Sequence, residues 1–183
     1  MSWHILGPTG ATRDLWVHPD GPGRPQYGRW VTPAGHDVRR EVGRRGVAHL
    51  DVEVWWVQAH DSRGTRLRDM LWRTDGGGAS LMSDRLVALL RDHGADLATS
   101  TADVRLRDGS PVPGYQLVLE PVGDAEAPVH SHYPDRRVGK VVVSSEIAAA
   151  IRAARLEGLR LEATDATFPD PVELTEAWWP GEG

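Results

Sequence analysis

The sequence predicts an α+β fold in which about two main helices pack on a mostly antiparallel sheet. Two stretches follow one pattern: an apolar run, a serine, an amphipathic segment of helical period and a glycine. Ser83 and Ser144 begin the two amphipathic segments, 61 residues apart. Short β-branched or alternating segments surround both units and are separated by turn residues. Helices that carry one apolar stripe bury it against a sheet, so this pattern indicates two layers around one core.

The N-terminal half is expected to supply short strands. Residues 1–48 are rich in Gly, Pro and Arg, so we expect an irregular N-terminal lobe there. Short strands are expected within it at residues 3–6, 15–18 and 30–32. Residues 50–57 alternate and then run apolar, which predicts a further strand. A chain of 183 residues is expected to form a single domain over residues 1–183.

The two serine units are predicted to be capped helices. A serine hydroxyl at the N-cap accepts from the free amides of the first turn. Gly94 after the first helix can adopt the left-handed conformation that ends a helix. Aligned on the serines, the apolar positions coincide: Leu86 with Ile147, Leu89 with Ala150, and Leu90 with Ile151. This i, i+3, i+4 spacing is typical of a helix packed on one face.

Further elements are expected between and after the two helices. Residues 104–106 and 115–119 are predicted to form an antiparallel hairpin, because their connection is short and contains Asp-Gly-Ser-Pro. Residues 123–137 are expected to be a polar loop. Strands are predicted at 141–143 and 159–161. Residues 163–183 contain three prolines and are expected to be an acidic C-terminal arm that ends in tryptophan.

Charge and composition narrow the classes of function. No Lys or Arg follows Arg160, whereas six Asp and Glu residues do. Such a surface repels nucleic acid and attracts a basic protein, although a solvated acidic tail is the more frequent explanation of such an excess. The absence of cysteine rules out disulfides and thiolate sites. No segment approaches the roughly 20 apolar residues of a membrane span, and no signal peptide is visible, so we expect a cytoplasmic protein without a membrane partner.

The best metal candidates are His130 and His132, because alternate residues on a strand share one face. A catalytic zinc needs three protein ligands, and the nearest third group is Asp135. Two histidines in a polar loop are more often simply exposed. Gly7 to Gly10 lacks the lysine and the spacing of a phosphate-binding loop. We therefore expect no catalytic residues, no metal and no cofactor.

Three segments carry a resemblance to a known family. They are Leu-Met-Ser-Asp-Arg-Leu-x-x-Leu-Leu at residues 81–90, Tyr-Gln-Leu-Val-Leu at 115–119, and Val-Val-Val-Ser-Ser-Glu-Ile from residue 141, whose helix ends in Leu-Glu-Gly-Leu. Over about residues 81–162 the chain resembles the bacterial polymorphic-toxin immunity proteins of family eleven, formerly a domain of unknown function. The resemblance implies a non-enzymatic immunity protein that binds and neutralises a cognate toxin in the cytoplasm.

Tryptophan suggests where such a protein would bind its partner. The chain has eight tryptophans and one phenylalanine. Tryptophans anchor protein interfaces and stack on sugars, although core packing is the more frequent role for any one of them. We expect the partner-binding residues to be Trp178, Trp179, Glu173 and Glu176. The alternatives are a generic protein- or carbohydrate-binding module that uses exposed tryptophans and, less favoured, a metal-dependent hydrolase at His130 and His132.

Overall fold

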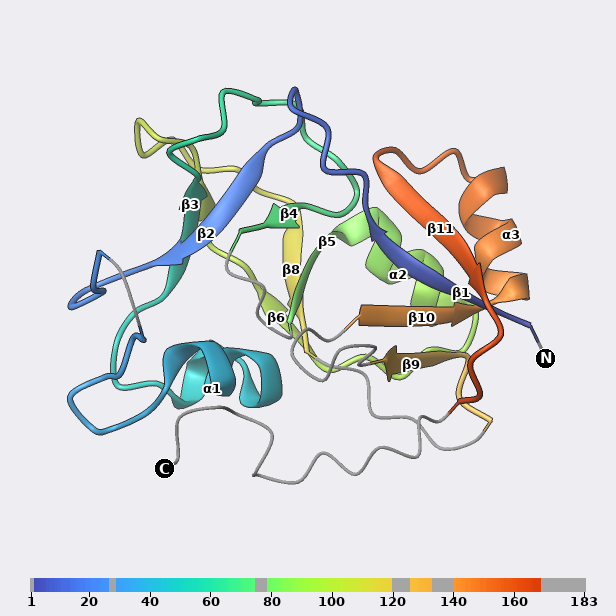
Figure 1. The fold of residues 1–183 in the computed structure, drawn as a ribbon, viewed down its shortest axis with the longest axis horizontal. Helices are drawn as coiled ribbons and strands as arrows, with labels where there is room; N and C mark the ends of the chain where they lie inside the picture. The colour runs from blue at the N-terminus through green and yellow to red at the C-terminus, as the bar shows by residue number, and fades with distance from the viewer. Residues whose placement is uncertain (1, 27–28, 75–78, 120–125, 133–139, 169–183) are drawn as a thin grey trace.

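The chain adopts the predicted α+β fold, with most strands antiparallel (Figure 1). The computed structural model describes residues 2–26, 29–74, 79–119, 126–132 and 140–168. Within these residues the strands form three small sheets, and two helices, α2 and α3, pack against each other and against two of the sheets.

The first sheet joins the two ends of the described chain. Its strands, in spatial order, are β11 (Leu159–Thr164), β1 (Trp3–Pro8), β10 (Lys140–Ser144) and β9 (Val129–His132). All three pairings are antiparallel. The strands predicted at residues 3–6, 141–143 and 159–161 are confirmed, and the N-terminal strand β1 lies between the two strands from the C-terminal half.

The other two sheets are built from the middle of the chain. One has the order β4 (Trp72–Arg73), β2 (Trp16–Asp20), β3 (Trp55–Gln58) and β7 (Val104–Arg105). The other has the order β5 (Ser80–Ser83), β8 (Tyr115–Val118) and β6 (Thr99–Thr101). In the β4-β2-β3-β7 sheet two of the pairings are parallel, β2 with β4 and β3 with β7.

The two predicted serine-capped helices are confirmed. They are α2 (Asp84–Asp92) and α3 (Ser145–Ala153). The hydroxyl of Ser83 accepts from the amide of Leu86, and that of Ser144 accepts from the amide of Ile147. Gly94 has a φ of 83°, the left-handed conformation expected after the first helix.

The β5-β8-β6 sheet separates two apolar cores. Neighbouring strand residues point to opposite faces, so Leu81 of β5 packs with β2, β3 and α1, whereas Met82 packs with α2 and α3. On β8, Leu117 and Val118 divide between the two cores in the same way. Because the β5-β8-β6 sheet contributes side chains to both cores, it couples the stability of α2 and α3 to that of the β4-β2-β3-β7 sheet.

One helix in the N-terminal region is not expected from the sequence. Residues Val38–Arg45 form α1, and a 3₁₀ turn, η1 (Val47–His49), follows it. Asp37 caps α1 by accepting from the amide of Arg40. Val38 and Val42 bury one side of this otherwise arginine-rich helix, which explains why it forms despite a central glycine.

Three strand predictions are wrong in part. Residues 104–106 and 115–119 do not pair as a hairpin, because β7 pairs with β3 and β8 lies between β5 and β6. Only the end of residues 50–57 is a strand, since the carboxylate of Asp51 instead accepts from the amide of Ala34. Residues 30–32 make only a single bridge, from Val31 to Asp37.

The predicted polar loop at 123–137 contains a strand. Residues Val129–His132 form β9, which pairs with β10 along its whole length. Val129 and His130 are both buried there, so the segment contributes to the core rather than running over the surface. Residues 123–125 and 133–137 of the predicted loop lie outside the described residues.

Candidate functional site

The interface predicted from the sequence, Trp178, Trp179, Glu173 and Glu176, lies outside the described residues. Its role stays a prediction. The described part of the chain offers two other surfaces whose chemistry suits a partner. One is a group of exposed aromatic and basic residues, and the other is a groove between α2 and α3.

The histidine pair has a structural role that the sequence did not suggest. His130 is 2% exposed, and its ring stacks on Phe168 with a centroid distance of 5.9 Å. Trp3 contacts the same histidine ring edge-on at 5.0 Å. The expectation that these histidines are exposed in a loop is therefore wrong for His130, because a strand carries it into an aromatic cluster. Asp135 lies outside the described residues, and among those described no three potential metal ligands come together.

Three of the six tryptophans in the described segments are core residues. Trp3, Trp30 and Trp56 are each less than 9% exposed and pack among apolar side chains. Trp72 differs, because it is 38% exposed on the short strand β4. It is one of three large apolar side chains that are exposed in the described residues, with Leu67 at 49% and Val31 at 46%.

Trp72 belongs to a group of residues that the backbone holds together. We call it the Trp72 surface, and its members are Trp72, Trp16, Leu67, Arg13 and Arg66. The rings of Trp16 and Trp72 lie 6.0 Å apart at an angle of 39°, because β2 and β4 place these residues side by side. The amide of Arg66 donates to the carbonyl of Arg13 at 3.1 Å, which brings the two loops together (Figure 1).

Local contacts fix the orientation of the two tryptophan rings. The indole nitrogen of Trp16 donates to the carbonyl of Ala11 at 3.1 Å. Gly10 packs so closely on Trp72 that a Cβ at this position would lie 2.8 Å from the ring. Gly10 also has a φ of 63°, where a side chain is disfavoured. Exposed tryptophans held in this way lose little conformational entropy on binding.

The Trp72 surface is basic. Arg13 and Arg66 are exposed, and Arg13 makes no ion pair with any residue that the structure describes. Arg66 lies 3.7 Å from Glu157, but both side chains are more than half exposed, so this pair contributes little stability. Both arginines can therefore meet acidic groups of a partner.

A partly buried polar network adjoins this surface, because Asp14 and Arg68 lie on the same two loop segments. Nε of Arg68 donates to Asp14 at 2.7 Å, and its Nη1 donates to Glu157 at 2.6 Å. Burial raises the pKa of Asp14, but hydrogen bonds from Arg68 and Thr9 and the charge of Arg68 outweigh it and hold the pKa below the ordinary 3.8. The network ties the loops of the Trp72 surface to the turn that follows α3.

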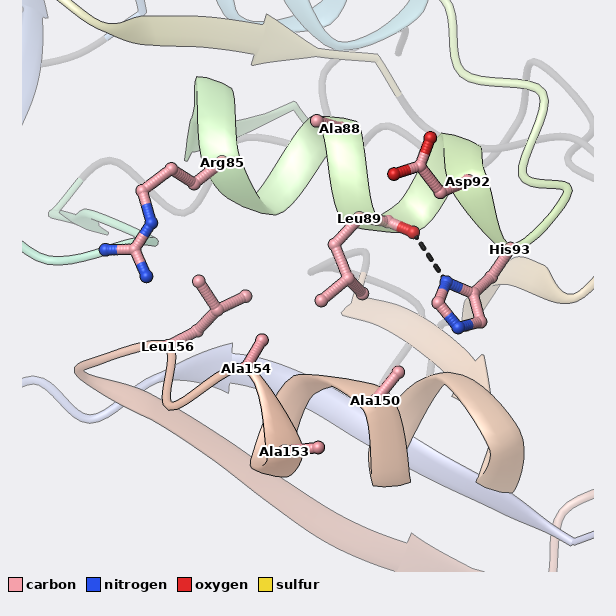
Figure 2. Close-up of a pocket in the computed structure, with 9 residues that line it drawn as sticks. All are labelled: Arg85, Ala88, Leu89, Asp92, His93, Ala150, Ala153, Ala154 and Leu156. Atoms are coloured by element: carbon pink, nitrogen blue, oxygen red, sulfur yellow. Dashed lines mark hydrogen bonds between the residues drawn. The ribbon is translucent and has the colours of Figure 1, made fainter.

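The second surface is an open groove of about 520 Å³ between α2 and α3 (Figure 2). Alanines of both helices line it together with Leu89 and Leu156. Arg85 stands at one end of the groove, and Asp92 and His93 stand at the other. Nδ1 of His93 is 2.9 Å from the carbonyl of Leu89, so this ring nitrogen carries the proton.

The sequence contained part of the information about both surfaces. Leu89 and Ala150, paired by the alignment of the two serine units, lie on facing helices beside the groove. The high tryptophan count favoured an aromatic surface. It did not single out Trp72, because exposure depends on which strands lie beside it.

Comparison with known proteins adds no assignment, since neither models of protein families nor curated proteins match this chain. In the described part of the chain, no helix is long and apolar enough to cross a bilayer.

Proposed function

We propose that this protein is a non-enzymatic immunity protein that binds and neutralises a cognate bacterial toxin in the cytoplasm. Its resemblance to immunity proteins over residues 81–162 supports the proposal, as does the Trp72 surface. The observation that carries it is that Trp72 is exposed beside Trp16, next to two hydrogen-bonded loop segments that carry the exposed residues Arg13, Arg66 and Leu67. Tryptophan and arginine are the residues most enriched among those that dominate protein interfaces.

The charge of the Trp72 surface indicates the chemistry of the partner. Because the exposed Arg13 and Arg66 lie on the loop segments next to β2, a complementary toxin surface would carry Asp or Glu beside an apolar pocket for Trp72. The acidic arm with Glu173 and Glu176 would meet basic groups elsewhere on the same partner. Opposite charges at two sites would fix one orientation of the complex.

The test is co-expression with the protein encoded by the adjacent reading frame, followed by scoring of host survival and co-purification. We expect survival and a stable complex with the wild-type chain. Trp72→Ala should weaken the complex by about 2 kcal/mol or more, the usual size of a central interface residue. Val31→Ala is the matched control, because Val31 is similarly exposed but lies before α1.

The outcomes separate the alternatives. Survival without a complex would contradict neutralisation by binding and favour an enzyme that reverses the damage. A complex that Trp72→Ala and Val31→Ala weaken equally would contradict the assignment of the Trp72 surface. A neighbour that is not toxic would leave the antidote proposal without its partner and overturn it.

A second candidate function is carbohydrate binding, which the exposed ring of Trp72 beside Trp16 favours. Aromatic rings stack on the apolar faces of sugars. The two rings here are inclined by 39°, so they do not form one flat platform, which favours the protein partner. Quenching of tryptophan fluorescence by members of a glycan panel, abolished by Trp72→Ala, would instead support the sugar.

A further inference from the structure

The groove between α2 and α3 has the shape of a site for an extended object. Small-molecule sites enclose most of their ligand, whereas this groove between two helices is largely open to solvent. Ala88, Ala150, Ala153 and Ala154 line it, so a third backbone could approach both helices closely. Leu89 and Leu156 supply apolar contact within it. An amphipathic helix laid in a groove satisfies these conditions.

The charges at the two ends of the groove oppose the dipole of α2. Arg85 is in its first turn, where the helix is positive, and Asp92 is its last residue, where the helix is negative. Neither side chain forms an ion pair with a described residue. Arg85 and Asp92 therefore interact unfavourably with the dipole of α2. They would interact favourably with the dipole of a neighbouring helix that runs in the opposite direction.

Helix α3 already runs in the direction opposite to α2. Ala150 lies near His93, and Ala154 and Leu156 lie near Arg85, so α3 runs antiparallel to α2 (Figure 2). A third helix parallel to α3 would place the free amides of its first turn near Asp92. The free carbonyls of its last turn would lie near Arg85. Both sets of groups need partners at the ends of any helix.

We propose that this groove binds an amphipathic α-helix of the toxin, oriented antiparallel to α2. The inference rests on the proposed function, because the toxin is the partner. The toxin helix presents bulky apolar side chains to the alanines and to Leu89 and Leu156. Its N-terminal turn lies at Asp92 and its C-terminal turn at Arg85.

Site-specific photo-crosslinking tests both the site and the direction. Benzoylphenylalanine replaces Ala150 in one variant and Ala154 in another, and each is bound to the toxin encoded by the adjacent reading frame. We expect both to crosslink to one toxin helix. Because the two positions are one helical turn apart, the Ala154 crosslink should lie about four residues C-terminal to the Ala150 crosslink in the toxin.

A matched control lies on the same helix. Ala149 of α3 is exposed but does not line the groove, so benzoylphenylalanine there should not label that toxin helix. The reverse order of the two groove crosslinks would overturn the proposed direction. Equal labelling from Ala149, or labelling of a segment that is not helical, would overturn the site.

Blocking the groove provides a second measurement. Ala153 is exposed at the end of α3 and lines the groove. We expect Ala153→Trp to raise the Kd for the toxin at least about tenfold with an unchanged Tm, whereas Ala149→Trp leaves the Kd within about twofold. Arg85→Glu, which needs no added volume, should also raise the Kd. If the wild-type chain binds the toxin and these variants bind equally well, the groove is not the binding site, whereas the proposed function stands. If the wild-type chain does not bind, the proposed function fails with it.

Discussion

Arg68 and Asp14 form an ion pair that joins the turn after β1 to the segment before β4. Nε of Arg68 lies 2.7 Å from Oδ1 of Asp14, and their side chains are 14% and 5% exposed. The same guanidinium reaches Glu157 after α3. Residues from three distant parts of the sequence therefore meet at one charge, next to the loop segments of the Trp72 surface.

Asp14→Asn should destabilise the protein by about 3 kcal/mol at neutral pH, because it leaves Arg68 with one exposed partner. The pH dependence follows from the lowered pKa of Asp14. A carboxyl with a lowered folded-state pKa contributes stability above its unfolded pKa of about 3.9, and this is lost as pH falls through the folded value.

Urea unfolding between neutral pH and pH below about 4 measures this effect. The wild type should lose more stability than Asp14→Asn over that range. Asp61→Asn is the control, because Asp61 is exposed. If Asp14→Asn and the wild type lose stability in parallel, the ion pair is not the source of the pH dependence.

The two helix-capping serines should differ in their contribution to stability. Ser144→Ala removes one cap and should cost about 1 kcal/mol. Ser83→Ala should cost about 2–3 kcal/mol, because its hydroxyl also donates to the buried carboxylate of Asp69 at 2.6 Å. Chemical denaturation of both variants gives the comparison, and equal losses would show that the bond to Asp69 is not stabilising.

Tyr115 should titrate late and contribute stability in the alkaline range. Burial raises its pKa to about 12, and its hydroxyl donates to the carbonyl of Arg68 at 2.7 Å. A raised folded-state pKa gives stability that is present below the unfolded pKa of about 10 and is lost as pH rises through about 12.

The absorbance of tyrosinate during an alkaline titration measures the pKa of Tyr115, which is one of three tyrosines in the chain. The step near pH 12 should disappear in Tyr115→Phe. A step that persists in the variant would assign the late titration to another residue.

Arg155→Gly should stabilise the protein. Arg155 has a φ of 51° and is the one non-glycine residue with positive φ in the described segments. Relief of this strain is worth about 1 kcal/mol, which raises the Tm by about 2–4 °C for a chain of this length. Thermal unfolding measures it, with Arg152→Gly inside α3 as a control that should lower the Tm. A lower Tm for Arg155→Gly would mean that its side chain makes a stabilising contact.

The predicted interface at the acidic arm remains testable by itself. Trp178→Ala combined with Trp179→Ala should reduce affinity for the toxin without lowering the Tm. Isothermal titration and thermal unfolding of the double variant provide both values. Loss of Tm would identify the two tryptophans as structural and contradict their assignment to the interface.

The sequence by itself determined the elements whose information is local. Both serine caps, the buried stripe of each helix and Gly94 follow from residues three or four positions apart, because a helix makes its hydrogen bonds within that distance. The Asp37 cap and the valines at 38 and 42 carried the same kind of signal for α1. The glycine and paired arginines around them obscured it.

Only the tertiary structure decided which segments lie together. The strand at Val104 pairs with β3, at Trp56, rather than with the predicted strand at residues 115–119, and His130 enters the core because β9 pairs with β10. The Trp72 surface joins residues more than 50 positions apart, and the groove exists only because α2 lies against α3. Strand pairing and helix packing depend on contacts between distant segments, and no periodicity within one segment encodes its partner.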